Sequence, residues 1–293
     1  LEGTTTGVQV NSTYGEPGNS SNNIRIRGFG SINGTNEPLI VVDGVPYSGS
    51  LNDINSSDIE SMSVLKDASS AALYGNKAAN GVILINTRKG KSSKLGVRLD
   101  IRQGIYTRGI PEYERLGIND WMETLWKGYK QYYMVDRGMD ATSAAQAVNQ
   151  TLISNVIKAN IFDKGDTELF DANGKFLGNV LSGYTDLDWN DALERNGYRQ
   201  EYNVSADAAG EKYDMFASAS YLNEQGYIIS SDFERFSGRM KANFQPTNWF
   251  KGGINLSASS QEGNYADSAE GSYYINPFYA SRMMAPVYPY YKH

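Results

Sequence analysis

The sequence predicts a small α+β domain over residues 1–92, followed over 93–293 by antiparallel β-strands with one apolar and one polar face. Short β-branched runs separated by glycine-containing turns predict the first part. Strict alternation of apolar and polar residues predicts the second part. No apolar run reaches the roughly 18 residues that a membrane-spanning helix needs. A chain of 293 residues is long enough for two domains.

The composition excludes several classes of site. The chain has no cysteine, so it forms neither a disulfide nor a thiolate metal site. Its single histidine, His293, is the last residue, which rules out a histidine-based catalytic triad and a histidine-rich metal site. A net charge of −6 and a pI near 5.0 argue against a nucleic-acid-binding surface. We therefore expect no metal, no cofactor and no nucleic-acid partner.

The first 92 residues contain a helix pattern among the strand patterns. Residues 67–74 predict a helix, with Asp67 as its N-cap and Gly75 at its C-terminal end. Tight turns are predicted at Asp43-Gly44 and Asn80-Gly81. Five runs rich in β-branched or large apolar residues predict strands, namely 7–11, 24–27, 39–42, 59–65 and 82–86.

Blocks of sequence in this domain carry a family resemblance. They read, in order, IRIRGFG (24–30), PLIVVDGVPY (38–47), DIESMSVLKDA (58–68), LYG (73–75) and ANGVILINT (79–87). Together they resemble the plug domain of TonB-dependent outer-membrane transporters, and within that class the SusC/RagA branch. The match is strong over 1–92 and continues in the rest of the chain as a strand pattern.

The resemblance implies a fold and a function. The fold would be an α+β plug domain followed by the first strands of an antiparallel transmembrane β-barrel in the outer membrane of a Gram-negative cell. The function would be import of oligosaccharides, or in some members peptides, with a SusD-like surface lipoprotein as lid. The TonB–ExbB–ExbD complex would supply the energy, and two transporter–lipoprotein pairs would form a dimer. No enzyme activity is implied.

One end of the plug-like domain is a candidate substrate site. If 24–27 and 39–42 pair antiparallel, the segments 12–23 and 46–54 emerge together at one end. The resemblance implies that this end is the plug apex, which touches substrate. Ordinary polar loop residues are an equally open interpretation. The candidates are Tyr14, Glu16, Asn19, Tyr47, Ser48 and Asn52.

A pair of arginines is a candidate anchor between plug and barrel. Arg25 and Arg27 alternate with isoleucines, so both guanidinium groups lie on one face of the predicted strand. If that face is covered, both need carboxylate partners. The resemblance implies that acidic residues on the inner wall of the barrel supply them. A solvated strand face is the alternative.

Five later segments show the two-residue alternation, namely 97–105, 198–207, 213–221, 235–244 and 250–258. The third and the fourth begin and end their apolar face in an aromatic eight residues apart, with Tyr213 and Tyr221 in one and Phe236 and Phe244 in the other. At ~3.3 Å per residue and a tilt near 40°, this spacing covers roughly 20 Å. That approximates an apolar membrane band between two aromatic girdles. Periodicity alone does not decide which face points outward, but the aromatic pairs and the plug-like domain favour lipid on the apolar face.

The connections between these segments alternate in length. Those at 209–212 and 245–248 are tight, whereas 223–232 is longer and 108–197 is very long. This is the outer-membrane pattern of short turns on one side and long loops on the other. Helix patterns at 119–133 and 143–159 predict that the long connection is a folded extracellular cap. Its aromatic residues fit either sugar stacking or internal packing, and they are Trp121, Trp126, Tyr129, Tyr132 and Tyr133.

Two further expectations concern the whole protein. Membrane barrels need about eight strands, so we expect more strands after His293. The resemblance implies a TonB-contacting segment before Leu1. No signal-peptide pattern begins at Leu1. The alternative from another class is a β-rich surface binding module that does not transport. An enzyme acting on glycans would need two carboxylates that converge, and the sequence pairs none.

Overall fold

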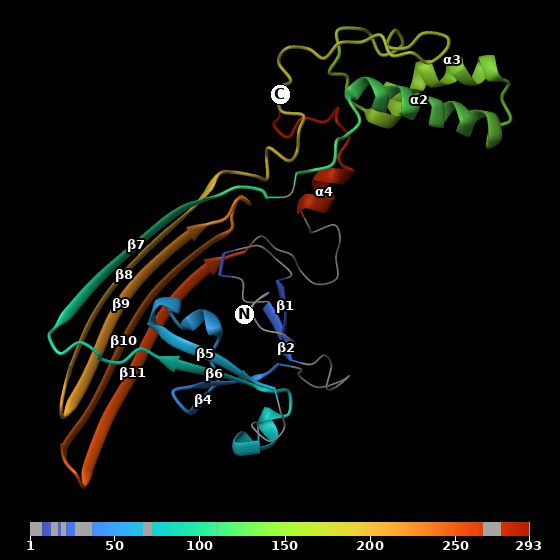
Figure 1. Ribbon diagram of the computed structural model, residues 1–293. Coiled ribbons are helices and arrows are strands. Elements are labelled where there is room, and N and C mark those ends of the chain that lie inside the picture. Colours follow the sequence, from blue (N-terminus) through green and yellow to red (C-terminus); the bar gives the residue numbers. More distant parts are fainter. Residues whose placement is uncertain are drawn as a thin grey trace. The chain divides into compact units, whose positions relative to one another are not determined.

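The computed structural model describes residues 8–12, 17–18, 22–26, 37–66, 72–109, 111–265 and 277–292. The chain forms two compact units (Figure 1). The first comprises residues 1–107 and 196–266, and the second comprises 108–195 and 267–293. Among the helices of the described ranges, none is both long and apolar enough to cross a membrane.

The N-terminal domain of the first unit is built on a four-stranded sheet. Its strands are β3 (Leu39–Val42), β4 (Val45–Tyr47), β5 (Ile59–Leu65) and β6 (Val82–Thr87), in the order β4-β3-β6-β5. β3 runs parallel to β6, and the other pairs are antiparallel. Val41, Val82 and Ile83 are fully buried and form its core. The strand predictions at 39–42, 59–65 and 82–86 are confirmed.

The antiparallel pairing of 24–27 with 39–42, on which the predicted plug apex was conditional, is not the one that the structure shows. β2 (Asn22–Ile26) pairs with β1 (Val8–Ser12) in a separate two-stranded ribbon. Both edges of β3 are taken, one by β4 and the other by β6, so no edge remains for β2. The predicted common end for 12–23 and 46–54 therefore loses its geometric basis.

Turns and short helices connect these strands. Asp43 and Gly44 have φ of 50° and 86°, the left-handed pair that a two-residue hairpin turn requires, so this predicted turn is confirmed. Two 3₁₀ turns follow β4, η1 (Leu51–Asp53) and η2 (Ser56–Asp58). The helix predicted over 67–74 falls largely outside the described residues. Within them, η3 (Ala72–Ala78) has 3₁₀ geometry and is interrupted at Gly75, whose φ is 66°.

Five long antiparallel strands form the second sheet of this unit, here called the long-strand sheet (Figure 1). They follow one another in sequence order, which confirms the five segments predicted from alternation. The connections at 211–212 and 248–249 are short, 226–231 is longer and 107–196 is very long, as predicted. The strands are β7 (Gly96–Tyr106), β8 (Gly197–Gly210), β9 (Tyr213–Gln225), β10 (Asp232–Thr247) and β11 (Phe250–Asn264).

The two faces of the long-strand sheet differ as the alternation predicts. The apolar face is exposed, with Leu99, Phe236 and Leu256 at 64%, 55% and 58%. On β8 to β10 the polar face is buried in part, with Glu201 and Arg239 at only 3% and 8%. Contacts described below place the N-terminal domain against this polar face. The structure therefore settles the orientation that periodicity leaves open, because the apolar side chains point away from the protein.

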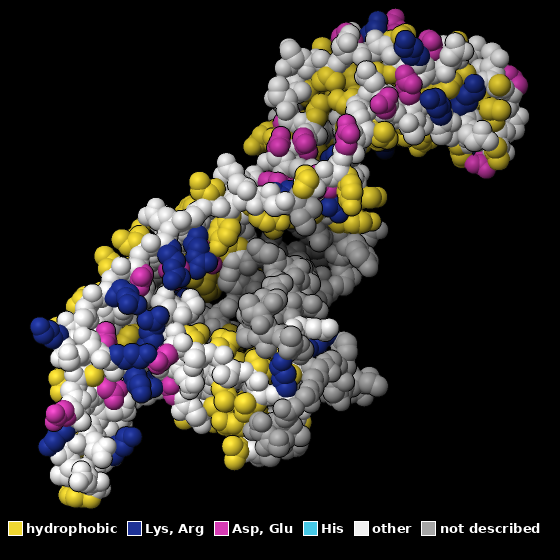
Figure 2. Space-filling model, viewed as in Figure 1, with side chains coloured by type: hydrophobic (Ala, Val, Ile, Leu, Met, Phe, Trp, Pro, Cys, Tyr) yellow, Lys and Arg dark blue, Asp and Glu magenta, His cyan; other side chains and the backbone are white. Residues whose placement is uncertain are grey.

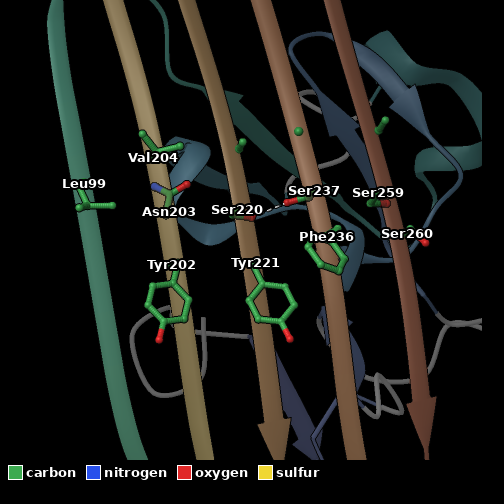
Figure 3. A pocket seen from close by; sticks show the side chains of 13 residues that line it. Leu99, Tyr202, Asn203, Val204, Ser220, Tyr221, Phe236, Ser237, Ser259 and Ser260 are labelled. Atoms are coloured by element: carbon green, nitrogen blue, oxygen red, sulfur yellow. Dashed lines mark hydrogen bonds between the residues drawn. The ribbon is translucent and has the colours of Figure 1, made fainter.

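Aromatic side chains on the exposed face stand in rows across the strands. Tyr202, Tyr221 and Phe236 are cross-strand neighbours on β8, β9 and β10, and their rings lie side by side in Figure 3. The ring centroids are 6.4 Å apart for the two tyrosines and 4.6 Å for Tyr221 and Phe236. A second group, with Tyr213 opposite Phe244, lies eight residues away from the first on both β9 and β10. Both groups are where the sequence predicts girdles.

The second unit is mainly helical. α2 (Ile118–Val135) packs on α3 (Ala141–Thr151), which continues into the π-helical turn η4 (Leu152–Ile157), and α4 (Pro277–Met283) follows later in the chain. The Asp140 carboxylate caps α3 by accepting from the amides of Thr142 and Ser143. The predicted helices at 119–133 and 143–159 are confirmed. The core of this unit includes Met122, Trp126, Val148, Leu152, Phe162, Leu169, Phe176 and Val287.

Candidate functional site

The main polar cluster of the first unit joins the N-terminal domain to the long-strand sheet at Asp43. One carboxylate oxygen accepts from the Thr87 amide at 3.0 Å and lies 3.1 Å from Lys241 Nζ. The other accepts from Arg239 Nη2 at 2.8 Å, from Asn255 Nδ2 at 2.9 Å and from the Thr87 hydroxyl. The β3–β4 turn thus presents one carboxylate to side chains of β10 and β11.

Electrostatics favour the ionised form of Asp43. Burial raises the pKa of this carboxyl, but the hydrogen bonds from Thr87, Lys241 and Arg239 outweigh it and hold the pKa well below its usual range. The Arg239 guanidinium is buried and also donates to Asn255 Oδ1 at 2.8 Å. A buried ion pair with this many hydrogen bonds is specific in geometry, and loss of one partner leaves a charge stranded.

Further contacts extend this interface along the sheet. Arg235 Nη1 on β10 donates to the backbone carbonyl of Asn52 in η1. Asn55 Nδ2 donates to Asn203 Oδ1 on β8 at 3.3 Å, and both side chains are buried. Asp58 in η2 is also buried, and it interacts with arginine charges of both the N-terminal domain and the long-strand sheet. Burial raises the pKa of its carboxyl, and the charges of Arg239, Arg88 and Arg235 only partly oppose this rise.

Buried polar atoms without a protein partner also gather here. Among the described residues, the buried side-chain atoms without a hydrogen bond are Oγ of Ser57, Oδ1 of Asp58, Nε of Arg88, Oγ of Ser218, Nε of Arg235 and Nε of Arg239. The first three belong to the N-terminal domain and the last three to the long-strand sheet. Buried polar groups are normally satisfied by ordered water where protein partners are absent, so we expect water along this seam. A cavity of about 400 Å³ adjoins it, with Asp58 and Arg239 in its lining.

The segment after β6 fixes the domain to the sheet covalently and by close packing. The amides of Lys91 and Ser92 both donate to Asp207 Oδ2 on β8 at 3.0 Å. A Cβ added at Gly90 would stand 2.1 Å from the Ala208 carbonyl oxygen, so a glycine is required for this approach.

Figure 2 shows Lys and Arg side chains gathered over the long-strand sheet, with apolar side chains along its margin.

The structure describes three of the six candidate residues for the plug apex. Tyr47 donates its hydroxyl proton to Asp53 Oδ2 at 3.0 Å, and burial together with Asp53 raises the pKa of Tyr47 to about 12. Asn52 donates from Nδ2 to the Gly18 carbonyl at 2.9 Å, and Ser48 is exposed after β4. Tyr14, Glu16 and Asn19 lie outside the described residues. Substrate contact stays a prediction for all six.

The arginine pair on β2 is described only in part. Arg25 lies on β2 opposite Gln9 of β1, and Arg27 lies outside the described residues. The inner face of the sheet does carry buried acids, Glu201 and Glu224. Arg199 of the sheet itself contacts both, at 2.9 and 2.8 Å. Anchoring by Arg25 and Arg27 stays a prediction.

Sequence reasoning missed the anchor that the structure shows. Here the carboxylate belongs to the N-terminal domain and the cations belong to the sheet, an arrangement separate from the one predicted for Arg25 and Arg27. Asp43 and Arg239 are 196 residues apart in sequence, and no local pattern links them. The sequence feature that could have indicated this anchor is the position of Arg239 and Lys241 on the polar face of an alternating strand.

Among the described residues, no group of three or more His, Asp or Glu side chains is placed to hold a metal ion. In the second unit, Trp126 is buried and donates from Nε1 to Asn149 Oδ1 at 2.6 Å. Tyr133 hydrogen-bonds the Thr151 hydroxyl at 3.1 Å. These two aromatics pack internally, whereas Trp121, Tyr129 and Tyr132 line the surface of α2.

Comparison with known proteins agrees with this architecture. Residues 1–82 match the family described as TonB-dependent Receptor Plug Domain. The chain is 29% identical over 292 residues to TonB-dependent receptor P26 of Formosa agariphila, covering 98% of this chain and 25% of that protein. It is 28% identical over 279 residues to TonB-dependent receptor SusC of Bacteroides thetaiotaomicron, covering 92% and 23%. The chain thus spans about a quarter of these relatives.

Comparison with solved structures agrees with the sequence comparison. The RagAB peptide importer in its closed-closed state superposes with a TM-score of 0.68 at 25% identity, over 93% of this chain and 30% of that one. The RagAB peptide transporter gives a TM-score of 0.67 at 26% identity, over 90% and 28%. The plug-domain match, the sequence relatives and the shared fold thus agree that the chain is similar to SusC/RagA-like TonB-dependent receptors.

Proposed function

We propose that the parent protein is an outer-membrane importer, with residues 1–92 as its plug and 93–293 as the first part of its barrel. The observation that carries this proposal is the two-faced long-strand sheet. Its exposed apolar face bears two aromatic rows, which suits contact with the outer-membrane lipid of a Gram-negative cell. Its polar face holds the N-terminal domain, which suits a gate inside a lumen.

The interface supports a gate that can be released. Its specific contacts are ionic and polar, centred on Asp43, Arg239 and Lys241. Buried polar atoms without a protein hydrogen bond and an adjoining cavity lie along it, so water has room to bridge its polar groups and to take over their hydrogen bonds when the two surfaces separate. Pulling by the TonB–ExbB–ExbD complex would then separate the plug from the wall without breaking an apolar core. No covalent chemistry is needed, and we propose no enzyme activity.

The proposed substrate is an oligosaccharide, delivered with a SusD-like surface lipoprotein acting as lid. What the SusC/RagA resemblance implies supports this assignment, together with the similarity to SusC over most of this chain. Import of peptides is the second candidate, which the similarity to the RagAB peptide importer favours. We further propose that two transporter–lipoprotein pairs assemble into a dimer.

Co-purification tests the proposed function. The full-length parent, tagged and extracted from outer membranes in detergent, is expected to bring down a surface lipoprotein in stoichiometric amount, identified by mass spectrometry. Soluble-fraction protein from the same cells serves as the control. A parent found in the soluble fraction without such a partner would refute the importer and favour a surface binding module.

A further inference from the structure

A groove on one flank of α2 has no part in the plug–sheet interface. Its volume is about 580 Å³, and six residues of this helix line it: Trp121, Thr124, Leu125, Gly128, Tyr129 and Tyr132. At 100° per residue, these positions lie beside the stripe of Met122, Trp126 and Tyr133 that packs towards α3. The groove therefore belongs to the outer surface of the helical unit.

The aromatic side chains of the groove are held in place by their neighbours. Tyr132 accepts a hydrogen bond at its hydroxyl from Arg137 Nε at 3.2 Å. Its ring is 6.3 Å from that of Tyr129 and 5.5 Å from that of Tyr133, both edge to face. Trp121 and Tyr129 pack partly on the core of the unit. A ligand would meet rigid rings, which reduces the entropy lost on binding.

Gly128 at the floor of the groove has no structural explanation within the fold. It lies in the interior of an 18-residue helix with helical backbone geometry, and glycine is the poorest helix former apart from proline. A Cβ at this position would meet nothing within 4 Å, so alanine would fit. A glycine in such a place allows a ligand to approach the helix backbone closely.

The chemistry of the lining selects the class of ligand. None of the six lining residues is charged, which favours a neutral ligand over a polyanion or a highly charged peptide. Aromatic faces stack on the apolar face of a sugar ring, while the Tyr129 and Tyr132 hydroxyls at the rim can bond its hydroxyl groups.

We propose that this groove binds a neutral oligosaccharide, with one sugar ring seated over Gly128 between Trp121 and the Tyr129–Tyr132 pair. The inference goes beyond transport, because binding at this groove requires neither TonB nor a lid. It identifies the helical unit as a glycan-contacting surface of the parent protein.

The test measures binding of neutral hexasaccharides (maltohexaose, cellohexaose, xylohexaose and mannohexaose) to the full-length parent in detergent by calorimetry. At least one is expected to bind. Gly128→Leu, which fills the groove and raises helix propensity, and Tyr132→Ala are each expected to weaken it at least tenfold. Gln131→Ala, on the same helix outside the groove, is the matched control and should leave affinity unchanged.

Three results would overturn the inference: no binding of any of the four hexasaccharides, equal affinity for Gly128→Leu and wild type, or tighter binding of oligogalacturonate than of all neutral probes. Loss of lipoprotein co-purification in Gly128→Leu, without glycan binding by wild type, would assign the groove to a protein partner instead. Failure of uptake with glycan binding retained would refute the importer and leave this inference standing.

Discussion

Replacing Asp43 by alanine is expected to weaken the seating of the N-terminal domain by about 3–5 kcal/mol. The change strands Arg239 and Lys241 at a buried interface and removes an acceptor from the Thr87 amide. Hydrogen exchange of the β3 and β6 amides in the full-length parent measures the effect, which corresponds to at least about a hundredfold faster exchange. Because the pKa of Asp43 is lowered in the folded state, its contribution is present above the ordinary carboxyl pKa and is lost only as the pH falls through the lowered value. The difference should therefore persist from roughly pH 5 to 8.

The matched control is Glu60→Ala. Glu60 pairs with Lys91 at 2.6 Å, but the Lys91 side chain is 66% exposed, and exposed pairs contribute about 0–1 kcal/mol. Adding Arg239→Met to Asp43→Ala should recover part of the loss, because it removes one stranded charge. Equal exchange rates in Asp43→Ala and Glu60→Ala would contradict the anchoring role of Asp43.

Replacing Met240 by arginine is expected to destabilise the long-strand sheet in the membrane by about 2–4 kcal/mol. Met240 is exposed on the apolar face, midway along β10 between Phe236 and Phe244, so it lies near the centre of the proposed lipid-facing band. Its cross-strand neighbours are Ala217 and Leu256, so a guanidinium there would meet apolar side chains and lipid instead of an acidic partner. The free energy of unfolding of the parent in lipid vesicles, from urea titration, measures the cost.

An arginine introduced in a turn, outside the apolar face, provides the control. Asn248→Arg lies between β10 and β11, where the proposed membrane ends, and should cost at most about 1 kcal/mol. If both variants lose the same stability, or neither loses any, the apolar face does not meet lipid.

Local patterns in the sequence were enough to predict most strands of this fold. Alternation marks β7 to β11 because each carries polar side chains on one face and apolar side chains on the other, and on β8 to β10 much of the polar face is buried. It could not show which face is covered, since an apolar interior produces the same period. The sequence did not predict β4, because this strand has only three residues and one of them is Pro46. Without β4, the wrong partner was assigned to β3.

The candidate site was less accessible from sequence. Asp43 was recognised only as a turn residue, because its geometry at φ 50° is a local property. Its partners Arg239 and Asn255 are brought in by tertiary packing across most of the chain. Tyr47 and Asn52 were selected because they lie in a segment assigned to the plug apex, and the structure shows each hydrogen-bonded within its own domain. Such pairings follow from the packed interface and leave no periodic trace in the sequence.

The central claim, a sheet with lipid on one face and a plug on the other, is tested most directly by spin labels along β8. In a cysteine-free parent reconstituted in lipid vesicles, single cysteines at 201–206 carry a nitroxide, and its collisions with lipid-dissolved oxygen are measured. Tyr202, Val204 and Ala206 are expected to collide often, and Glu201, Asn203 and Ser205 rarely. An absence of the two-residue period, or the opposite phase, would contradict the account.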